Sequence, residues 1–290
     1  MKKILVLILV SLLLSGMTAA CAQEDAVVVV TSFYPLYVAT INITEGVPGV
    51  AAFNLTPPEA GCPHEYQLTA KDRTLLARAD VLITNGAGLE GFLDRLLPTL
   101  QARTINASDG VELLPGRHDA ANPHVWVSVA GMKAQVQNII DGLSAADPFN
   151  AQAYLKNGTA YMEKLSQLER EMTESLLPVD GQPIITFHEA FDYFARDYGL
   201  RVVAIMEGND GNAPAASDIA KTIATAEKEQ VKALFTEPFN QNVTVDVIAR
   251  ETNLPVYVLD PVVSGNSGND KDAYINAMKE NAKVLLEALR

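Results

Sequence analysis

A helical pattern near the middle of the chain, from Asn150 to Leu176, constrains the fold more than any other feature. Its apolar positions, which include Tyr154, Leu165 and Met172, recur at helical spacing, and Gly158 is the one clear breaker within it. A helix of about 27 residues spans roughly 40 Å, which is too long for one small core. We therefore predict that this helix joins two lobes.

Short apolar runs alternate with amphipathic segments on both sides of this helix. Before it, we predict strands at 26–31, 50–55, 81–84 and 104–106, and helices at 34–45, 69–79, 89–100 and 129–143. After it, we predict strands at 183–187, 201–206, 231–235 and 256–259, and helices at 189–198, 215–229, 243–251 and 271–289. Such alternation predicts an α/β fold, with two lobes of mostly parallel sheet flanked by helices and joined by one long backbone helix.

The predicted organisation follows from this pattern and from chain length. Roughly 270 residues after a leader exceed one typical core, so two domains are expected. We predict four parts: a leader at 1–21, an N-terminal α/β lobe at 22–146, a connecting long helix at 147–180 and a C-terminal α/β lobe at 181–290.

The N-terminus predicts export. Lys2 and Lys3 precede an apolar run from Ile4 to Leu14, which is short for a transmembrane helix and typical of a signal peptide. Thr18-Ala19-Ala20 then leads into Cys21, as in a bacterial lipobox. We expect an extracytoplasmic protein held at the membrane by a lipid on Cys21. Ordinary cleavage before an unmodified Cys21 is the alternative.

Charge and cysteine content narrow the function further. Without the leader and its two lysines, 20 basic residues face 35 acidic ones, a net charge of −15. Nucleic-acid binding is therefore not expected, because phosphate contacts need a basic surface. If Cys21 carries a lipid, Cys62 has no partner, and the fold depends on its core alone. We expect a monomer.

Three of the four histidines and one aspartate follow predicted strands. His64 and His124 lie in segments after strands of the first lobe, His188 ends a strand of the second, and Asp260 ends its last strand. Ligands of open α/β sheets bind at the carboxyl ends of strands. Three imidazoles and one carboxylate would form a closed four-coordinate site suited to Zn²⁺. Taken singly, each histidine is also compatible with an ordinary surface or core position, and Asp260 with a turn.

Four ordered segments carry a family resemblance. They are Pro63-His64-Glu65-Tyr66, Asn122-Pro123-His124-Val125-Trp126, the segment from Phe187 to Leu200 that begins Phe187-His188-Glu189-Ala190-Phe191, and the pair Thr236-Glu237-Pro238 and Leu259-Asp260-Pro261. The chain resembles the zinc and manganese solute-binding proteins of ABC importers, called cluster A-I, over essentially its whole mature length. The resemblance implies two lobes with metal between them, delivery to a membrane permease, and no enzymatic activity.

This resemblance also implies the ligand set and the metal. It carries over His64, His124, His188 and Asp260 as ligands. Zinc-type members resemble this chain in having histidine at the third position, where manganese-type members usually have glutamate, and imidazole nitrogen suits Zn²⁺ better than Mn²⁺. The same role with Mn²⁺ or Fe²⁺ is the alternative.

The chain departs from the family pattern at a few positions. Cys62 and Asn122 stand where aspartate is more usual, and only Arg117-His118-Asp119 occupies the place of a long histidine-rich loop. Four acidic residues could orient the imidazoles from behind, with Glu237 the strongest candidate. They are Glu65, Glu189, Glu207 and Glu237.

The sequence also contains patterns of other functional classes. Gly86-Ala87-Gly88-Leu89-Glu90-Gly91 fits the dinucleotide pattern Gly-x-Gly-x-x-Gly, with Asp109 near the expected acidic offset. An exported protein has little access to NAD, so we expect this loop to be structural. An exported zinc hydrolase would need an open metal position, against which a fourth ligand at Asp260 argues. A surface adhesin is a third alternative.

Overall fold

The computed structural model describes residues 26–57, 61, 63–116, 120–207, 214–238, 243–263, 265 and 269–290. The predicted leader and Cys21 lie outside this range. None of the helices in the described part of the chain is both long and apolar enough to cross a bilayer.

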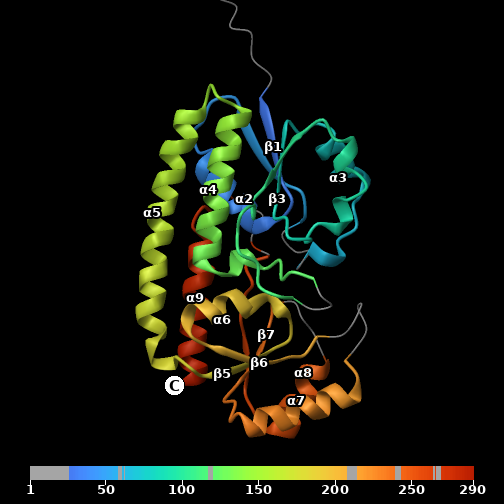
Figure 1. The fold of residues 1–290 in the computed structure, drawn as a ribbon, viewed down its shortest axis with the longest axis vertical. Helices are drawn as coiled ribbons and strands as arrows, with labels where there is room; N and C mark the ends of the chain where they lie inside the picture. Colours follow the sequence, from blue (N-terminus) through green and yellow to red (C-terminus); the bar gives the residue numbers. More distant parts are fainter. Residues whose placement is uncertain are drawn as a thin grey trace, which may run out of the picture.

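Two four-stranded sheets form the framework (Figure 1). The first has the order β2-β1-β3-β4 and comprises β1 (Val27–Thr31), β2 (Val50–Asn54), β3 (Val81–Thr84) and β4 (Arg103–Asn106). The second has the order β6-β5-β7-β8 and comprises β5 (Pro183–Thr186), β6 (Arg201–Ile205), β7 (Leu234–Thr236) and β8 (Val256–Val258). Neighbouring strands within both sheets are parallel. The predicted α/β class with two parallel sheets is confirmed.

Helices connect the strands, and several connections are short 3₁₀ turns. Within the described residues, the α-helices are α2 (Tyr34–Ile43), α3 (Ala70–Leu76), α4 (Val129–Ala146), α5 (Ala151–Leu176), α6 (Asp192–Tyr198), α7 (Ala216–Lys228), α8 (Val243–Thr252) and α9 (Ala273–Leu289). The 3₁₀ turns are η1 (Pro63–Glu65), η2 (Gly91–Leu93), η3 (Leu97–Thr99), η5 (Val125–Val127), η6 (Leu177–Val179) and η7 (Glu189–Phe191).

Both faces of the inner strands of each sheet are buried, which explains their near-continuous apolar sequence. On β1, Val29 packs into the large central cluster with α2 and α4, whereas Val30 faces the smaller cluster that includes Leu76 of α3. On β5, Ile184 joins the same central cluster, whereas Ile185 packs toward α7 and α8. The central cluster therefore runs through both lobes as one apolar core.

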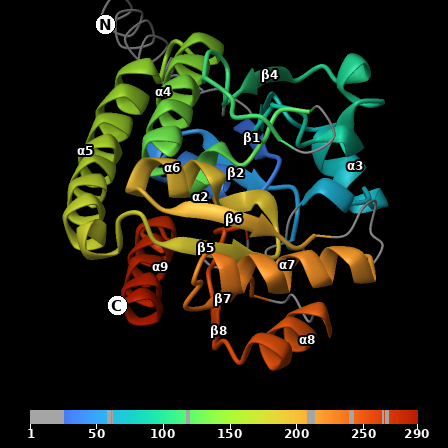
Figure 2. The same ribbon diagram turned by 60° about the horizontal axis from the view of Figure 1, so that its bottom comes forward.

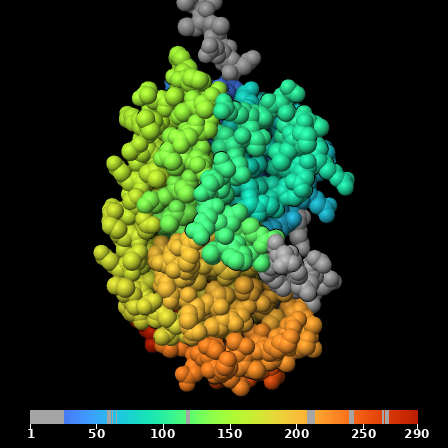
Figure 3. Space-filling view, in the orientation of Figure 1, coloured from blue at the N-terminus to red at the C-terminus, as the bar shows by residue number. Residues whose placement is uncertain are grey.

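The long helix α5 has 26 residues and packs against elements of both lobes. Its neighbours are α2 and α4 of the first lobe and α6 and α9 of the second, and α9 lies beside it in Figures 1 and 2. One buried stripe makes these contacts, formed by Tyr154, Gly158, Tyr161, Leu165, Leu168, Met172 and Leu176. On the face shown in Figure 3, the green segment of the first lobe lies directly against the gold second lobe.

Two predicted elements differ most from the structure. The helix predicted at 89–100 is instead the two turns η2 and η3, because Pro98 interrupts the helical hydrogen bonds and Glu90 folds back onto the preceding loop. The strand predicted at 231–235 begins only at Leu234. Gln230 has a φ of 56°, and the Val231 N–H still bonds to the end of α7, so these residues close that helix.

We predict that Gly158→Val destabilises the protein, because a Cβ at Gly158 would lie 2.3 Å from Cδ1 of Ile140 on α4. Overpacking of this kind costs about 1–3 kcal/mol. Ala160→Val, on the exposed side of the same helix, should cost only about 0.5 kcal/mol of helix propensity. Urea denaturation of both variants measures the difference, and equal losses would contradict close α4–α5 packing at Gly158.

Candidate metal centre

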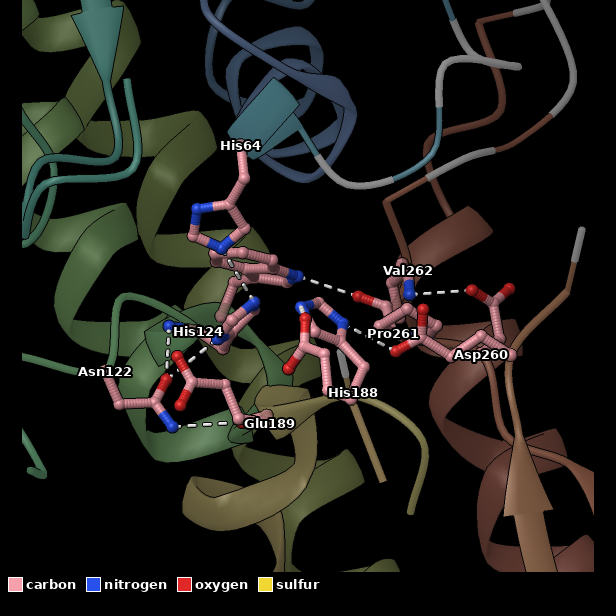
Figure 4. Close-up of polar contacts among 11 residues, drawn as sticks. His64, Asn122, His124, His188, Glu189, Asp260, Pro261 and Val262 are labelled. Carbon is pink, nitrogen blue, oxygen red and sulfur yellow. Dashed lines mark hydrogen bonds and ion pairs between the residues drawn. The ribbon is translucent and has the colours of Figure 1, made fainter. Parts of the chain in front are cut away.

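Three histidines from separate segments converge between the two sheets (Figure 4). His64 belongs to η1, His124 immediately precedes η5, and His188 lies between β5 and η7. Their ligand nitrogens all lie within 4.8 Å of one another. His124 and His188 are buried and His64 is exposed, so the cluster has one side open to solvent.

A short turn presents His64. Pro63 begins η1, and the Tyr66 N–H closes the turn on the Pro63 carbonyl. The Tyr66 hydroxyl donates to Asp72 at 2.8 Å, and Asp72 also forms a capping box with Thr69 at the start of α3. Burial, together with the hydrogen bond to Asp72, raises the pKa of Tyr66 to about 12. The His64 turn is thereby anchored to α3.

The side chain of Asn122 fixes the orientation of His124. Its Oδ1 accepts from the His124 backbone N–H at 2.9 Å and lies 2.8 Å from Nδ1 of the same ring. Its Nδ2 donates to the Glu189 carbonyl and to Asp192, so the amide can point only one way. Nδ1 of His124 must then carry the proton, which leaves a lone pair on Nε2.

Carboxylates hold His188 in the corresponding way. Glu237, just beyond β7, places Oε1 2.8 Å from Nδ1 of His188. A proton on Nδ1 satisfies this contact and leaves the lone pair on Nε2, the nitrogen that could bind a metal. Glu207 places an oxygen 3.7 Å from that Nε2. The negative charge of the two glutamates favours a cation beside His188.

The spacing of the imidazoles suits one tetrahedral metal ion. Nε2 of His64 lies 3.3 Å from Nε2 of His124. Two nitrogens bound to one Zn²⁺ at its usual distance and tetrahedral angle are about 3.4 Å apart. Burial lowers the pKa of His124 well below its usual range, and the neighbouring His188 and His64 lower it further. His124 is therefore a neutral imidazole at neutral pH.

Asp260 is placed differently from the histidines. It follows β8 and is half-buried, and its Oδ1 accepts from the Val262 N–H at 2.7 Å. Burial raises its pKa, and the charge of Glu237 adds to the shift. Asp260 is not among the described residues whose ligand atoms gather within 4.8 Å. The structure thus brings three of the four predicted ligands together, and Asp260 lies on the adjacent loop (Figure 4).

Trp126 links that loop to His124. The Trp126 ring lies 5.2 Å from the His124 ring between centroids, and its Nε1 donates to the Pro261 carbonyl at 2.7 Å. Neither the contacts of Trp126 nor those of Asn122 were predicted from the sequence. The one available signal was the position of both residues beside His124 in a single short segment. Cys62, His118 and the side chain of Glu65 lie outside the described residues.

The lowered pKa of His124 predicts a pH dependence of folding stability. Unfolding lets this imidazole take up a proton, so the stabilisation present above about pH 6.5 is lost as the pH falls below that value. Between pH 7.5 and 5.5, metal-free wild type should lose about 1 kcal/mol more unfolding free energy than His124→Gln. Urea titrations in chelator at both pH values measure this. Parallel losses in the two proteins would show that His124 titrates normally in the fold.

Comparison with known proteins agrees with this architecture. The high-affinity zinc uptake system protein ZnuA of Bacillus subtilis is 30% identical over 291 residues, covering 93% of this chain and 90% of that protein. The zinc-binding lipoprotein AdcA of Streptococcus pneumoniae strain R6 is 30% identical over 307 residues. This chain covers only 60% of the length of AdcA.

A solved structure explains that partial coverage. The Zn(II)-bound ZnuA-like domain of S. pneumoniae AdcA superimposes with a TM-score of 0.77 at 29% identity, covering 91% of this chain and 99% of that domain. The model of the family ZnuA, described as zinc-uptake complex component A periplasmic, matches residues 29–288. This confirms the family resemblance derived from the four motifs. The chain belongs to the ZnuA family of zinc-uptake components, which are substrate-binding proteins of ABC transporters and not enzymes.

Proposed function

We propose that this protein captures Zn²⁺ between its lobes and delivers it to the permease of an ABC importer. The observation that carries the proposal is the convergence of three imidazoles, two of which have their Nδ1 atoms held by Asn122 and Glu237. Nitrogen ligands of this kind suit Zn²⁺, and both the family match and the names of the relatives agree with zinc as the cargo.

Asp260 is proposed as the fourth ligand. Its neighbour Pro261 accepts a hydrogen bond from Trp126, whose ring contacts His124, and this link between the Asp260 loop and His124 supports the proposal. One rotation of the side chain away from the Val262 N–H would offer an oxygen to a bound cation. Three nitrogens and one oxygen would close a tetrahedral site, as suits a cargo that must not react with water.

The proposal extends to location and organisation. The names of relatives include lipoproteins of metal ABC transporters, which supports an extracytoplasmic protein anchored through a lipid on Cys21. The sheets support lobes at 22–146 and 181–290, with 147–180 as the connection between them. We propose that the protein works as a monomer and that the permease induces release through a small shift at the cleft.

The test of the binding site is His188→Ala, with His118→Ala as the matched control. Loss of the His188 imidazole removes a ligand nitrogen and the ring that Glu207 and Glu237 contact. Zinc binding should therefore weaken at least a hundredfold. His118→Ala should bind like wild type. Competition with a chromophoric zinc chelator measures both affinities, and Mn²⁺ added against Zn²⁺ tests the alternative metal. Wild-type affinity in His188→Ala would remove that residue from the site.

The fourth ligand is tested separately with Asp260→Asn. Asparagine can still accept from the Val262 N–H but lacks the charge, so zinc affinity should fall about tenfold or more while the fold persists. Asp246→Asn, on the exposed face of α8, is the control and should not change affinity. The emission of Trp126, the only tryptophan of the chain, gives a second measurement of binding. Equal affinities in both variants would exclude a ligand role for Asp260.

A further inference from the structure

The loop that matches the dinucleotide pattern already holds a carboxyl group of its own, that of Glu90. In a dinucleotide fingerprint, backbone N–H groups of the loop point at phosphate. Here the N–H groups of Asn85 and Gly86 donate to the side chain of Glu90, at 2.6 and 3.1 Å. The loop also has the left-handed residues Gly86, Ala87 and Gly88, with φ of 77°, 52° and 83°. Glu90 thus occupies the position at which a phosphate would be bound.

Glu90 is buried and acts as an acceptor in each of these hydrogen bonds. Its third donor is the hydroxyl of Ser32, at 2.7 Å. Ser32 follows β1 and Asn85 follows β3, so one carboxylate joins the carboxyl ends of two neighbouring strands. The two backbone N–H groups among these partners can only donate, and they favour the ionised carboxylate. Burial raises the pKa of Glu90, and the hydrogen bond from Ser32 and those from the loop oppose that shift.

Asn85 transmits this arrangement to the metal centre. Its backbone is held by Glu90, and its side-chain Nδ2 donates to the Pro123 carbonyl at 2.9 Å. Its Oδ1 accepts from Gln135 of α4 at 2.7 Å, which fixes the direction of the amide. Pro123 immediately precedes His124, so Asn85 and Asn122 together set the backbone from which the imidazole projects.

We propose that Glu90 is a positioning residue for metal binding, an internal anion that orders Asn85 and thereby aims Nε2 of His124. The inference rests on the proposed binding of metal by His124. Glu90 itself touches no ligand nitrogen, so its removal should alter the geometry of the site without removing a donor. Weaker binding with unchanged stoichiometry is therefore expected, in contrast to the loss of a ligand.

The experiment removes the carboxylate of Glu90 and then supplies a small carboxylate, formate, from solution. Glu90→Ala should bind zinc roughly tenfold more weakly than wild type, at one ion per chain. Formate at millimolar concentration should restore much of that affinity, because it can accept the freed N–H groups of Asn85 and Gly86. Leu93→Ala, which opens a cavity at a fully buried apolar residue of η2, is the matched control. Its affinity should not respond to formate.

Two further variants keep the test independent of folding. Glu90→Gln preserves shape but places an amide beside the loop donors, and Asn85→Ala removes the link to Pro123. Both should weaken zinc binding and shift the visible absorption of the Co²⁺-loaded protein, which reports ligand geometry. Cooperative urea unfolding checks that each variant is folded.

The outcomes separate this inference from the proposed function. If wild type binds no zinc, the proposed function fails. If wild type binds zinc and all Glu90 and Asn85 variants match its affinity and Co²⁺ spectrum, the positioning role is overturned and the function stands. Weakened Glu90→Ala without formate rescue, together with a wild-type spectrum in Glu90→Gln, would also overturn the role of the anion.

Discussion

The amide of Asn122 is the contact on which the arrangement of this protein depends. Asn122 is fully buried. Its amide oxygen accepts a hydrogen bond from His124, and its amide nitrogen donates to the Glu189 carbonyl and to Asp192 of the other lobe. A buried amide left without partners costs about 1–3 kcal/mol, so the two lobes are held in the register that satisfies it. The same hydrogen bonds therefore fix both the orientation of the His124 imidazole and the relative position of the two lobes.

Other buried hydrogen bonds near the three histidines also join the two lobes. The Tyr193 hydroxyl donates to the Asn122 carbonyl, and the Tyr274 hydroxyl of α9 donates to the Trp126 carbonyl. The apolar core is continuous through both lobes, and α5 packs against each of them. A wide hinge opening would break these hydrogen bonds and expose that core. These contacts limit separation of the lobes, which accords with the small shift at the cleft proposed above.

The spacing of apolar residues predicted most of the fold, because each strand and helix is encoded by residues that are neighbours in the sequence. It failed at 89–100, where Pro98 and the return of Glu90 to Asn85 replace a helix with two 3₁₀ turns. The positions of the histidines after strands predicted that they would meet, since parallel strands place their carboxyl ends at one edge. The role of Asp260 stays a prediction, because its side-chain direction depends on the Val262 N–H and on a bound cation.

The sequence by itself determined the α/β class, the long connecting helix, the family and the set of candidate ligands, because these reside in local patterns and short motifs. Only the tertiary structure decided which nitrogen of His124 and of His188 is turned toward the other imidazoles, and that Asn122 and Trp126 support the centre. It also placed Glu237, the strongest candidate from the sequence, against Nδ1 of His188. It also showed that a loop with a dinucleotide pattern encloses its own carboxylate. These features depend on hydrogen bonds between residues far apart in the chain, whose partners exist only after both lobes have packed.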